Sequence, residues 1–388
     1  MINLDPRTIY LLTAFLGAVM SVVLFFLSRS FPPTIKGMAE WTAGPAVLFV
    51  AILLLGARGA IPDFFSMTVA SLALLSGMTL LYFGSRQFFG LPRSIRLWSG
   101  LILAAMAALI WYAHVEPHFG RRVQIVSLFV VLISTCHARL LLRHGRRGFA
   151  TYLTVAALLI QAAAHAVRVV TAFDLAPDAT LFALSPTQTA IVTSFTFSML
   201  MVSVGVVLMA TDRVRAEIEY LASHDALTGA LSRRALLDTC ERELERCRRK
   251  GHSMSLLMID LDNFKAINDS HGHQAGDRVL VDFAARVTAL LRRPDHFGRV
   301  GGEEFVALLP ETSLDDARIV AERIRADIAH AGARPWCTVS IGVAVSEAVG
   351  EAVNGAGHVI AVDALLARAD AALYAAKAAG RDCVRTAG

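Results

Sequence analysis

The chain has 388 residues, of which 55% are hydrophobic, and a formal net charge of +5. Its mean hydropathy of +0.55 excludes an ordinary soluble globular protein and indicates that a large part lies in a membrane. Five cysteines without CxxC or Cys/His metal spacing exclude a disulfide framework and a cysteine-bound metal. Only six of the 32 acidic residues precede Thr211, so the basic excess belongs to the first part of the chain. Length and charge distribution together predict two domains.

Seven apolar runs are long enough to cross a bilayer, which takes roughly 20 residues per helix. They lie near residues 8–27, 41–57, 64–83, 95–115, 123–142, 149–170 and 189–210, and the second is the shortest. We therefore predict an all-α bundle of about seven transmembrane helices. Eleven lysines and arginines fall in the segments on the same side as the C-terminal half, against five on the other side. The positive-inside rule thus predicts an N-terminus outside and a C-terminal half in the cytoplasm.

A polar face interrupts the sixth run. Gln161, His165 and Arg168 recur at helical spacing, so they share one face, which must turn toward the bundle interior or a water-filled cavity. One interpretation is a ligand or haem site. The interpretation that we favour is a polar face paired between helices near the outer surface of the membrane.

A charged helix follows the last run. It carries Val214, Ile218 and Leu221 at four-three spacing, which is typical either of a short parallel coiled coil or of an amphipathic helix that packs on the next domain. We therefore divide the chain into a transmembrane domain with a sensory role (residues 1–210), a signalling-helix linker (211–224) and a C-terminal domain (225–388).

The C-terminal domain shows alternating helices and strands, which predict an α/β sandwich with helices on a sheet. We expect helices at residues 233–250, 276–293, 314–330 and 362–379. Strands are expected at residues 253–261, 296–300, 305–309 and 336–345 and in a short final segment, and a surface loop at 349–357.

Carboxylates gather where two of these strands end or begin. Asp260 and Asp262 end an apolar strand, a usual place for catalytic groups, and Asp262 is expected to cap or to lie in solvent. Gly301 and Gly302 allow a tight hairpin, which Glu303 follows directly. If these segments are neighbours in the sheet, the carboxylates suit two Mg²⁺ ions that stabilise both oxygens in phosphoryl-type transfer.

Five motifs carry a family resemblance that covers the chain from about residue 222 to its end. They are DALTG (225–229), DLDNFKAIND (260–269), GHQAGD (272–277), GGEEF (301–305) and ADAALYAAKAAGR (369–381). Their order and spacing resemble those of the GGDEF domain of membrane-bound diguanylate cyclases. The resemblance implies a palm, or ferredoxin-like, nucleotidyl cyclase sheet with helices. Two departures, Glu303 in place of the commoner Asp and Ser232 in place of Asn, leave a metal ligand and a helix cap available.

The resemblance also implies roles at the metal site. Asp260, the carbonyl of Leu261 and Glu303 correspond to ligands of two Mg²⁺ ions, with Mn²⁺ as a substitute. Glu303 also corresponds to the proton acceptor, and Lys265 to a catalytic cation that faces the phosphates. Glu304 either assists the metal or is structural.

Further residues match the family's substrate site. Asn268 and Asp277 correspond to the pair that reads guanine, with His273 beside the nucleotide, while Lys377 and Arg381 face the phosphates. A buried amide and carboxylate reject a base that leaves them unpaired.

The implied activity joins two GTP molecules into cyclic di-GMP and two pyrophosphates. Each domain binds one GTP, so the active enzyme is a homodimer, in the lipid of a bacterial inner membrane and without a nucleic-acid partner. The alternatives are a catalytically idle domain that relays a signal through nucleotide binding, and a cyclase that makes a mixed dinucleotide. The sequence indicates neither the stimulus nor the downstream effector.

Arg292 and Asp295 match the RxxD site at which the product inhibits many such cyclases, with Arg323 as a partner residue. An arginine fork can hold a guanine edge or a phosphate, and an acid accepts from guanine N–H groups. The other interpretation is that this segment is the C-terminal end of a helix, where the arginines complement the helix dipole and the proline ends the helix.

Overall fold

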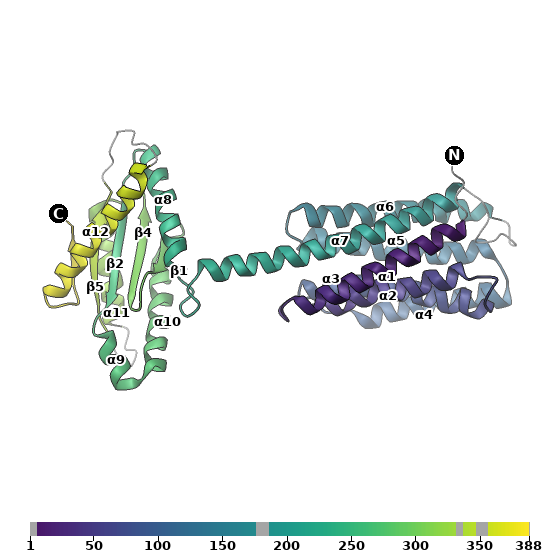
Figure 1. Ribbon diagram of the computed structural model, residues 1–388, viewed down its shortest axis with the longest axis horizontal. Coiled ribbons are helices and arrows are strands. Elements are labelled where there is room, and N and C mark those ends of the chain that lie inside the picture. The colour runs from purple at the N-terminus through teal and green to yellow at the C-terminus, as the bar shows by residue number, and fades with distance from the viewer. Residues whose placement is uncertain (1–5, 176–185, 331–336, 347–355, 388) are drawn as a thin grey trace. The chain divides into compact units, whose positions relative to one another are not determined.

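The structure is a computed structural model that describes residues 6–175, 186–330, 337–346 and 356–387 (Figure 1). The chain forms two compact units, Met1–Ala216 and Glu217–Gly388. Most of the predicted loop at 349–357 and the predicted strand start at Trp336 lie outside the described residues. Residues 356 and 357, at the end of that loop, are helical instead.

The first unit consists of long helices. They are α1 (Pro6–Ser30), α2 (Met38–Gly56), α3 (Ala70–Phe88), α4 (Ile95–Ile110), α5 (Phe119–His144), α6 (Phe149–Thr171) and α7 (Pro186–Ser223), of which α7 belongs to this unit up to Ala216. Short π-helical or 3₁₀ turns, η1 (Phe64–Val69), η2 (Trp111–Val115) and η3 (Ala172–Asp174), extend α3, α4 and α6. Within the described residues, seven helices are long and apolar enough to cross a membrane, which agrees with the seven apolar runs of the sequence.

Glycines let α2 and α3 pack closely in this bundle. A Cβ on Gly77 of α3 would lie 2.7 Å from the Leu48 side chain of α2, so only glycine fits without a shift. Beside this contact the fully buried Trp41 donates through Nε1 to Ser85 Oγ (3.2 Å), which lies 2.7 Å from His137 Nε2 of α5. A polar chain thus links three helices inside an apolar interior.

The second unit is built on one mixed sheet, with strand order β1-β3-β4-β2-β5-β6. The strands are β1 (Leu231–Ser232), β2 (Met254–Leu261), β3 (His296–Arg299), β4 (Glu304–Pro310), β5 (Val339–Val345) and β6 (Val384–Thr386). The central β2 is antiparallel to both β4 and β5, whereas β1–β3 and β5–β6 are parallel pairs. All eight residues of β2 are buried, which explains its unbroken apolar run.

Helices cover both faces of this sheet: α8 (Arg233–Arg249), α9 (Phe264–His271), α10 (His273–Leu290), α11 (Leu314–Ala329) and α12 (Ala356–Ala378) (Figure 1). Leu257 and Ile259 of β2 belong to the core with α10 and α11, while Leu256 and Met258 belong to the core with α8 and α12. Because side chains alternate along a strand, Asp260 follows the even-numbered set toward α12.

The predicted helix at 276–293 is wrong at both ends, and α9 is absent from the prediction. Gly272, with a φ of 79°, separates α9 from α10, which begins at His273 and ends at Leu290 because Leu291 is extended. β1 has only two residues, too few to give a period-two pattern. The other predicted elements of the domain are present with shifted ends. Ser232 caps α8 by accepting from Ala235 N, as its position predicted.

Candidate active site

The end of β2 and the β3–β4 hairpin lie side by side, as the sequence required for a shared site. Asp260 pairs with Glu304 in the antiparallel register, and Leu261 N donates to the Glu303 carbonyl at 3.3 Å. The backbone therefore fixes the hairpin carboxylates next to the strand-end carboxylate. This juxtaposition follows from pairing between segments more than 40 residues apart.

Asp260 is the electrostatic centre of this cluster. The residue is 5% exposed, and its Oδ2 lies 2.7 Å from Nζ of Lys377, which α12 supplies. Burial raises the pKa of Asp260 above its ordinary value; the hydrogen bond and charge of Lys377 oppose this rise, and the charges of Glu303 and Glu304 add to it. The cluster thus favours additional positive charge.

The donor set fits a magnesium-type ion. Buried or hairpin carboxylates are hard oxygen donors, and Mg²⁺ is usually held by one or two of them together with substrate phosphates. Within the described ranges, no group of three or more His, Cys, Asp or Glu side chains converges closely enough to hold a metal by itself. A site that needs the nucleotide's phosphates to complete its coordination agrees with both observations.

Arg299 fixes the hairpin and was missed as a site residue by sequence reasoning. Its Nε donates to the carbonyls of Gly301 (3.2 Å) and Gly302 (3.1 Å), and its Nη1 lies 3.0 Å from Asp225 Oδ1. Burial raises the pKa of Asp225, but hydrogen bonds from Thr228 and Arg299 outweigh it, so the pKa is lowered. The first motif of the domain is therefore tied to the hairpin, a link that only the folded contacts reveal.

Asp262 has a buried structural role. It is 3% exposed and accepts hydrogen bonds from Thr338 Oγ1 (2.7 Å), Ser340 Oγ (2.7 Å) and Asp382 N (3.1 Å). The prediction that it caps a helix or lies in solvent is therefore wrong. Because it connects β2 to β5 and to the segment before β6, it anchors the strand end that carries Asp260.

The residues matched to the guanine site come from α9 and α10. A Cβ on Gly276 would collide with the Asn268 amide, so glycine lets that side chain lie against the first turn of α10. Asp277 follows Gly276 directly and is exposed, as is His273. The structure therefore brings Asn268 next to the turn that carries Asp277.

The remaining cations differ in their surroundings. The Lys377 side chain pairs with Asp260, whereas the side chains of Lys265 and Arg381 are exposed and form no hydrogen bond or ion pair with other described residues. Arg381 adopts a left-handed backbone, with a φ of 67°, in the turn after α12. Two of the three predicted phosphate-facing cations are thus available to solvent ligands.

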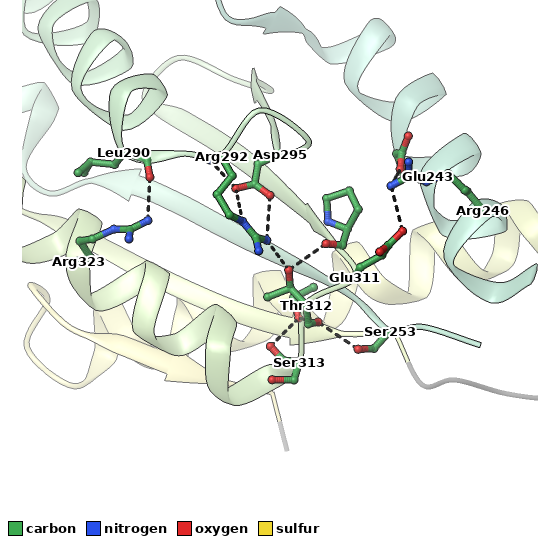
Figure 2. Close-up of polar contacts among 12 residues, drawn as sticks. Glu243, Arg246, Ser253, Leu290, Arg292, Asp295, Glu311, Thr312, Ser313 and Arg323 are labelled. Atoms are coloured by element: carbon green, nitrogen blue, oxygen red, sulfur yellow. Dashed lines mark hydrogen bonds and ion pairs between the residues drawn. The ribbon is translucent and has the colours of Figure 1, made fainter. Parts of the chain in front are cut away.

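Figure 2 shows the residues matched to the inhibitory site. Arg292 Nη2 lies 3.2 Å from Asp295 Oδ1 and donates to Thr312 Oγ1 at 2.8 Å, and Arg292 N donates to Asp295 Oδ2 at 2.8 Å. Arg323 Nη2 donates to the Leu290 carbonyl at 2.7 Å, at the end of α10. The Asp295 side chain is 1% exposed, whereas that of Arg292 is 53% exposed. The three residues therefore meet around the end of α10, with Arg292 facing solvent.

The fold and these contacts define an α/β domain with a mixed six-stranded sheet and a carboxylate cluster where its central strand ends. Residues 222–383 match the profile of the family described as diguanylate cyclase, GGDEF domain. This part of the chain is a GGDEF domain, as its motifs predicted.

Known proteins resemble the same part. Diguanylate cyclase DgcP of Pseudomonas aeruginosa is 45% identical over 163 residues, 41% of this chain and 23% of that protein. Response regulator PleD of Caulobacter vibrioides is 40% identical over 182 residues, 45% of this chain and 38% of PleD. The crystal structure of the GGDEF domain of DgcB from Caulobacter crescentus in complex with c-di-GMP is 32% identical, with 43% of this chain and 93% of that chain covered and a TM-score of 0.38. The chain spans less than half the length of either curated relative.

Proposed function

We propose that the chain is a membrane-anchored diguanylate cyclase, active as a homodimer, that condenses two GTP molecules into cyclic di-GMP and two pyrophosphates. The observation that carries this proposal is the buried Asp260, held beside Glu303 and Lys377 at the end of β2 of a GGDEF domain. A costly buried carboxylate next to two further acids is hard to explain by stability alone.

In this mechanism Asp260, Glu303 and the Leu261 carbonyl would hold Mg²⁺, and Glu304 would add negative charge beside them. When bound, the metal supplies positive charge that offsets the charge of the reacting phosphates. Glu303 accepts the proton of a GTP 3′-hydroxyl as its oxygen attacks the α-phosphorus of the GTP on the partner domain. The bond from that phosphorus to the β-phosphate oxygen breaks, and pyrophosphate leaves. The same exchange in the opposite direction closes the ring.

The cations and the α9–α10 pair position the substrate. Lys265 and Arg381 are free to neutralise phosphate oxygens, and the ammonium group of Lys377, beside Asp260, would add positive charge near them. Asn268 and Asp277 bind the guanine edge, with His273 beside the nucleotide. Specificity for guanine follows because another base would leave the amide and the carboxylate unpaired.

Two kinds of control belong to the same proposal. The seven apolar helices anchor the chain in the inner membrane with the GGDEF domain in the cytoplasm, and α7 is one continuous helix from the last span to Ser223. A signal received in the bundle can therefore alter how two cyclase domains meet. Product binding at Arg292, Asp295 and Arg323 provides feedback, since an exposed arginine fork beside a carboxylate suits a guanine edge.

The test is to incubate the purified full chain with GTP and Mg²⁺ and to identify products by mass. We expect cyclic di-GMP and pyrophosphate from the wild type and none from Glu303→Gln, which removes the proton acceptor but keeps the side-chain shape. Glu322→Gln, at an exposed site on α11, is the matched control and should retain activity. Nucleotide binding without turnover in the wild type would identify an idle relay, and a mixed product would refute guanine selectivity.

A further inference from the structure

A cavity of about 150 Å³ lies among the helices of the first unit. Most of its lining is apolar and includes Leu109, Val123 and Phe195. Three arginines also line it: Arg58 after α2, Arg122 on α5 and Arg168 on α6. The predicted topology places all three toward the outer side of the membrane. No acidic side chain is among the described residues that line the cavity.

None of these three guanidinium groups forms an ion pair with a carboxylate of the described part of the chain, and the one carboxylate there whose charge acts on them is Asp63, near Arg122. Arg122 Nη1 lies 2.8 Å from the Met67 sulfur, and Arg58 Nη2 lies 3.9 Å from the same atom. Arg168 Nη2 donates to Gln188 Oε1 at 2.9 Å. Thioether and amide groups are neutral acceptors, and sulfur is a weak one. Because charged side chains inside a bundle are normally paired, three cations around one cavity leave excess positive charge there.

Polar atoms that point to a ligand accompany the charge. Ser66 is fully buried and His165 is 4% exposed, yet neither Ser66 Oγ nor His165 Nε2 has a hydrogen-bond partner among the residues that the structure describes, and Arg122 Nε has none there either. The other ring nitrogen of His165, Nδ1, lies 3.4 Å from Ser127 Oγ of α5, so helix pairing accounts for only one side of the ring. All three unpartnered atoms belong to residues that line the cavity.

We infer that this cavity binds a small oxyanion with an apolar body, of the class of aromatic or short aliphatic carboxylates. The arginines and the unpartnered donors would bind the anionic oxygens, because a guanidinium fork matches a carboxylate in two parallel hydrogen bonds. The apolar wall would hold the body, since a cavity of about 150 Å³ accommodates a group the size of benzene. The same oxyanion chemistry has two sources, a free acid and the head group of an anionic lipid.

The experiment measures binding to the full-length chain in nanodiscs of a zwitterionic lipid. Benzoate and hexanoate are the probes, and benzamide and hexanamide are neutral probes of matched shape. We expect the carboxylates to bind at least tenfold more tightly than the amides and to raise the melting temperature. Both measurements use the wild-type chain. Equal effects of acid and amide would overturn the inference. It would also be overturned if neither acid bound, which is the result expected of a cavity that holds only water.

Variants locate the site. Arg122→Gln and Arg168→Gln should each weaken benzoate binding at least tenfold. Arg121→Gln is the matched control, since Arg121 is exposed, precedes Arg122 on the same helix and does not line the cavity. Circular dichroism confirms that each variant is folded, and Ser66→Ala, which removes a single hydroxyl, repeats the test with less disturbance. Unchanged binding in all three lining variants would contradict the assignment.

A last arm separates the two sources. The titration is repeated in nanodiscs that contain an anionic phosphatidylglycerol. Binding of benzoate that is unaffected by this lipid supports a free acid, and equal competition by the lipid in the wild type and in Arg121→Gln, which retains the site, supports a lipid head group in the same cavity. The binding readout does not depend on cyclase activity, so it holds even if the proposed function fails.

Discussion

Replacing Lys377 by methionine is expected to strengthen the binding of a divalent cation to the nucleotide-free protein. Lys377 Nζ forms an ion pair with Asp260 Oδ2 at 2.7 Å. A metal ion that coordinates this oxygen must therefore first displace the ammonium group. The side chain of Asp260 is 7% exposed and that of Lys377 is 35% exposed, so the ion pair is intermediate between an exposed and a buried salt bridge. Exposed pairs contribute roughly 0.2–1 kcal/mol. Taking about 1 kcal/mol for the pair, and tenfold per 1.4 kcal/mol, the dissociation constant should fall about fivefold.

The assay is a titration of Mn²⁺ followed by electron paramagnetic resonance, at mildly alkaline pH and without nucleotide. Methionine keeps the length of the side chain and its packing on α12 while removing the charge. Lys265→Met is the matched control, because Lys265 is exposed and makes no ion pair with the described residues, and its affinity for Mn²⁺ should not change. Unchanged or weaker Mn²⁺ binding in Lys377→Met would show that this amine does not compete with the metal ion for Asp260.

Three further predictions concern other parts of the domain. Asp225→Asn should lower stability at neutral pH by about 1 kcal/mol, discounted for its partial exposure. Because the folded pKa of Asp225 is lowered, this difference is present above the unfolded pKa and should vanish as the pH falls through the folded pKa in urea titrations. Gly276→Ala should raise the KM for GTP at least tenfold by displacing Asn268, with folding checked by circular dichroism. Arg292→Ala should keep the initial velocity but give linear progress curves as product accumulates; Arg293→Ala, at an exposed neighbour, should still slow.

Much of the fold was predictable because its signals are local. Seven apolar runs and the alternation of helices with strands each depend on short-range periodicity, and the structure contains both. The separation of α9 from α10 was missed because it depends on one glycine, Gly272, in a left-handed conformation. A sequence window around that position still shows helical propensity on both sides.

The candidate site divides in the same way. Asp260 and the hairpin acids could be proposed from the sequence because burying a carboxylate at the end of an apolar strand costs free energy that no local structural role offsets. Arg299 and Asp225 were not identified as partners, since 74 residues separate them and a single sequence holds no record of their contact. Asp262 has the same local setting as Asp260, two residues away. Only the hydrogen bonds from Thr338 and Ser340 show that it is structural.

The charged clusters of the two units differ in whether their side chains are already paired with an opposite charge. In the GGDEF domain, Asp260 is paired with Lys377 and Asp295 with Arg292, so these two buried carboxylates have cationic partners before any ligand binds. A ligand there must exchange one ion pair for another, which lowers affinity but keeps the free domain stable. In the bundle, Arg58, Arg122 and Arg168 line a cavity whose described walls hold no acid, so an anion would displace only the neutral acceptors Met67 and Gln188. A bound anion should therefore raise the stability of the bundle in proportion to its affinity, without first having to break an ion pair.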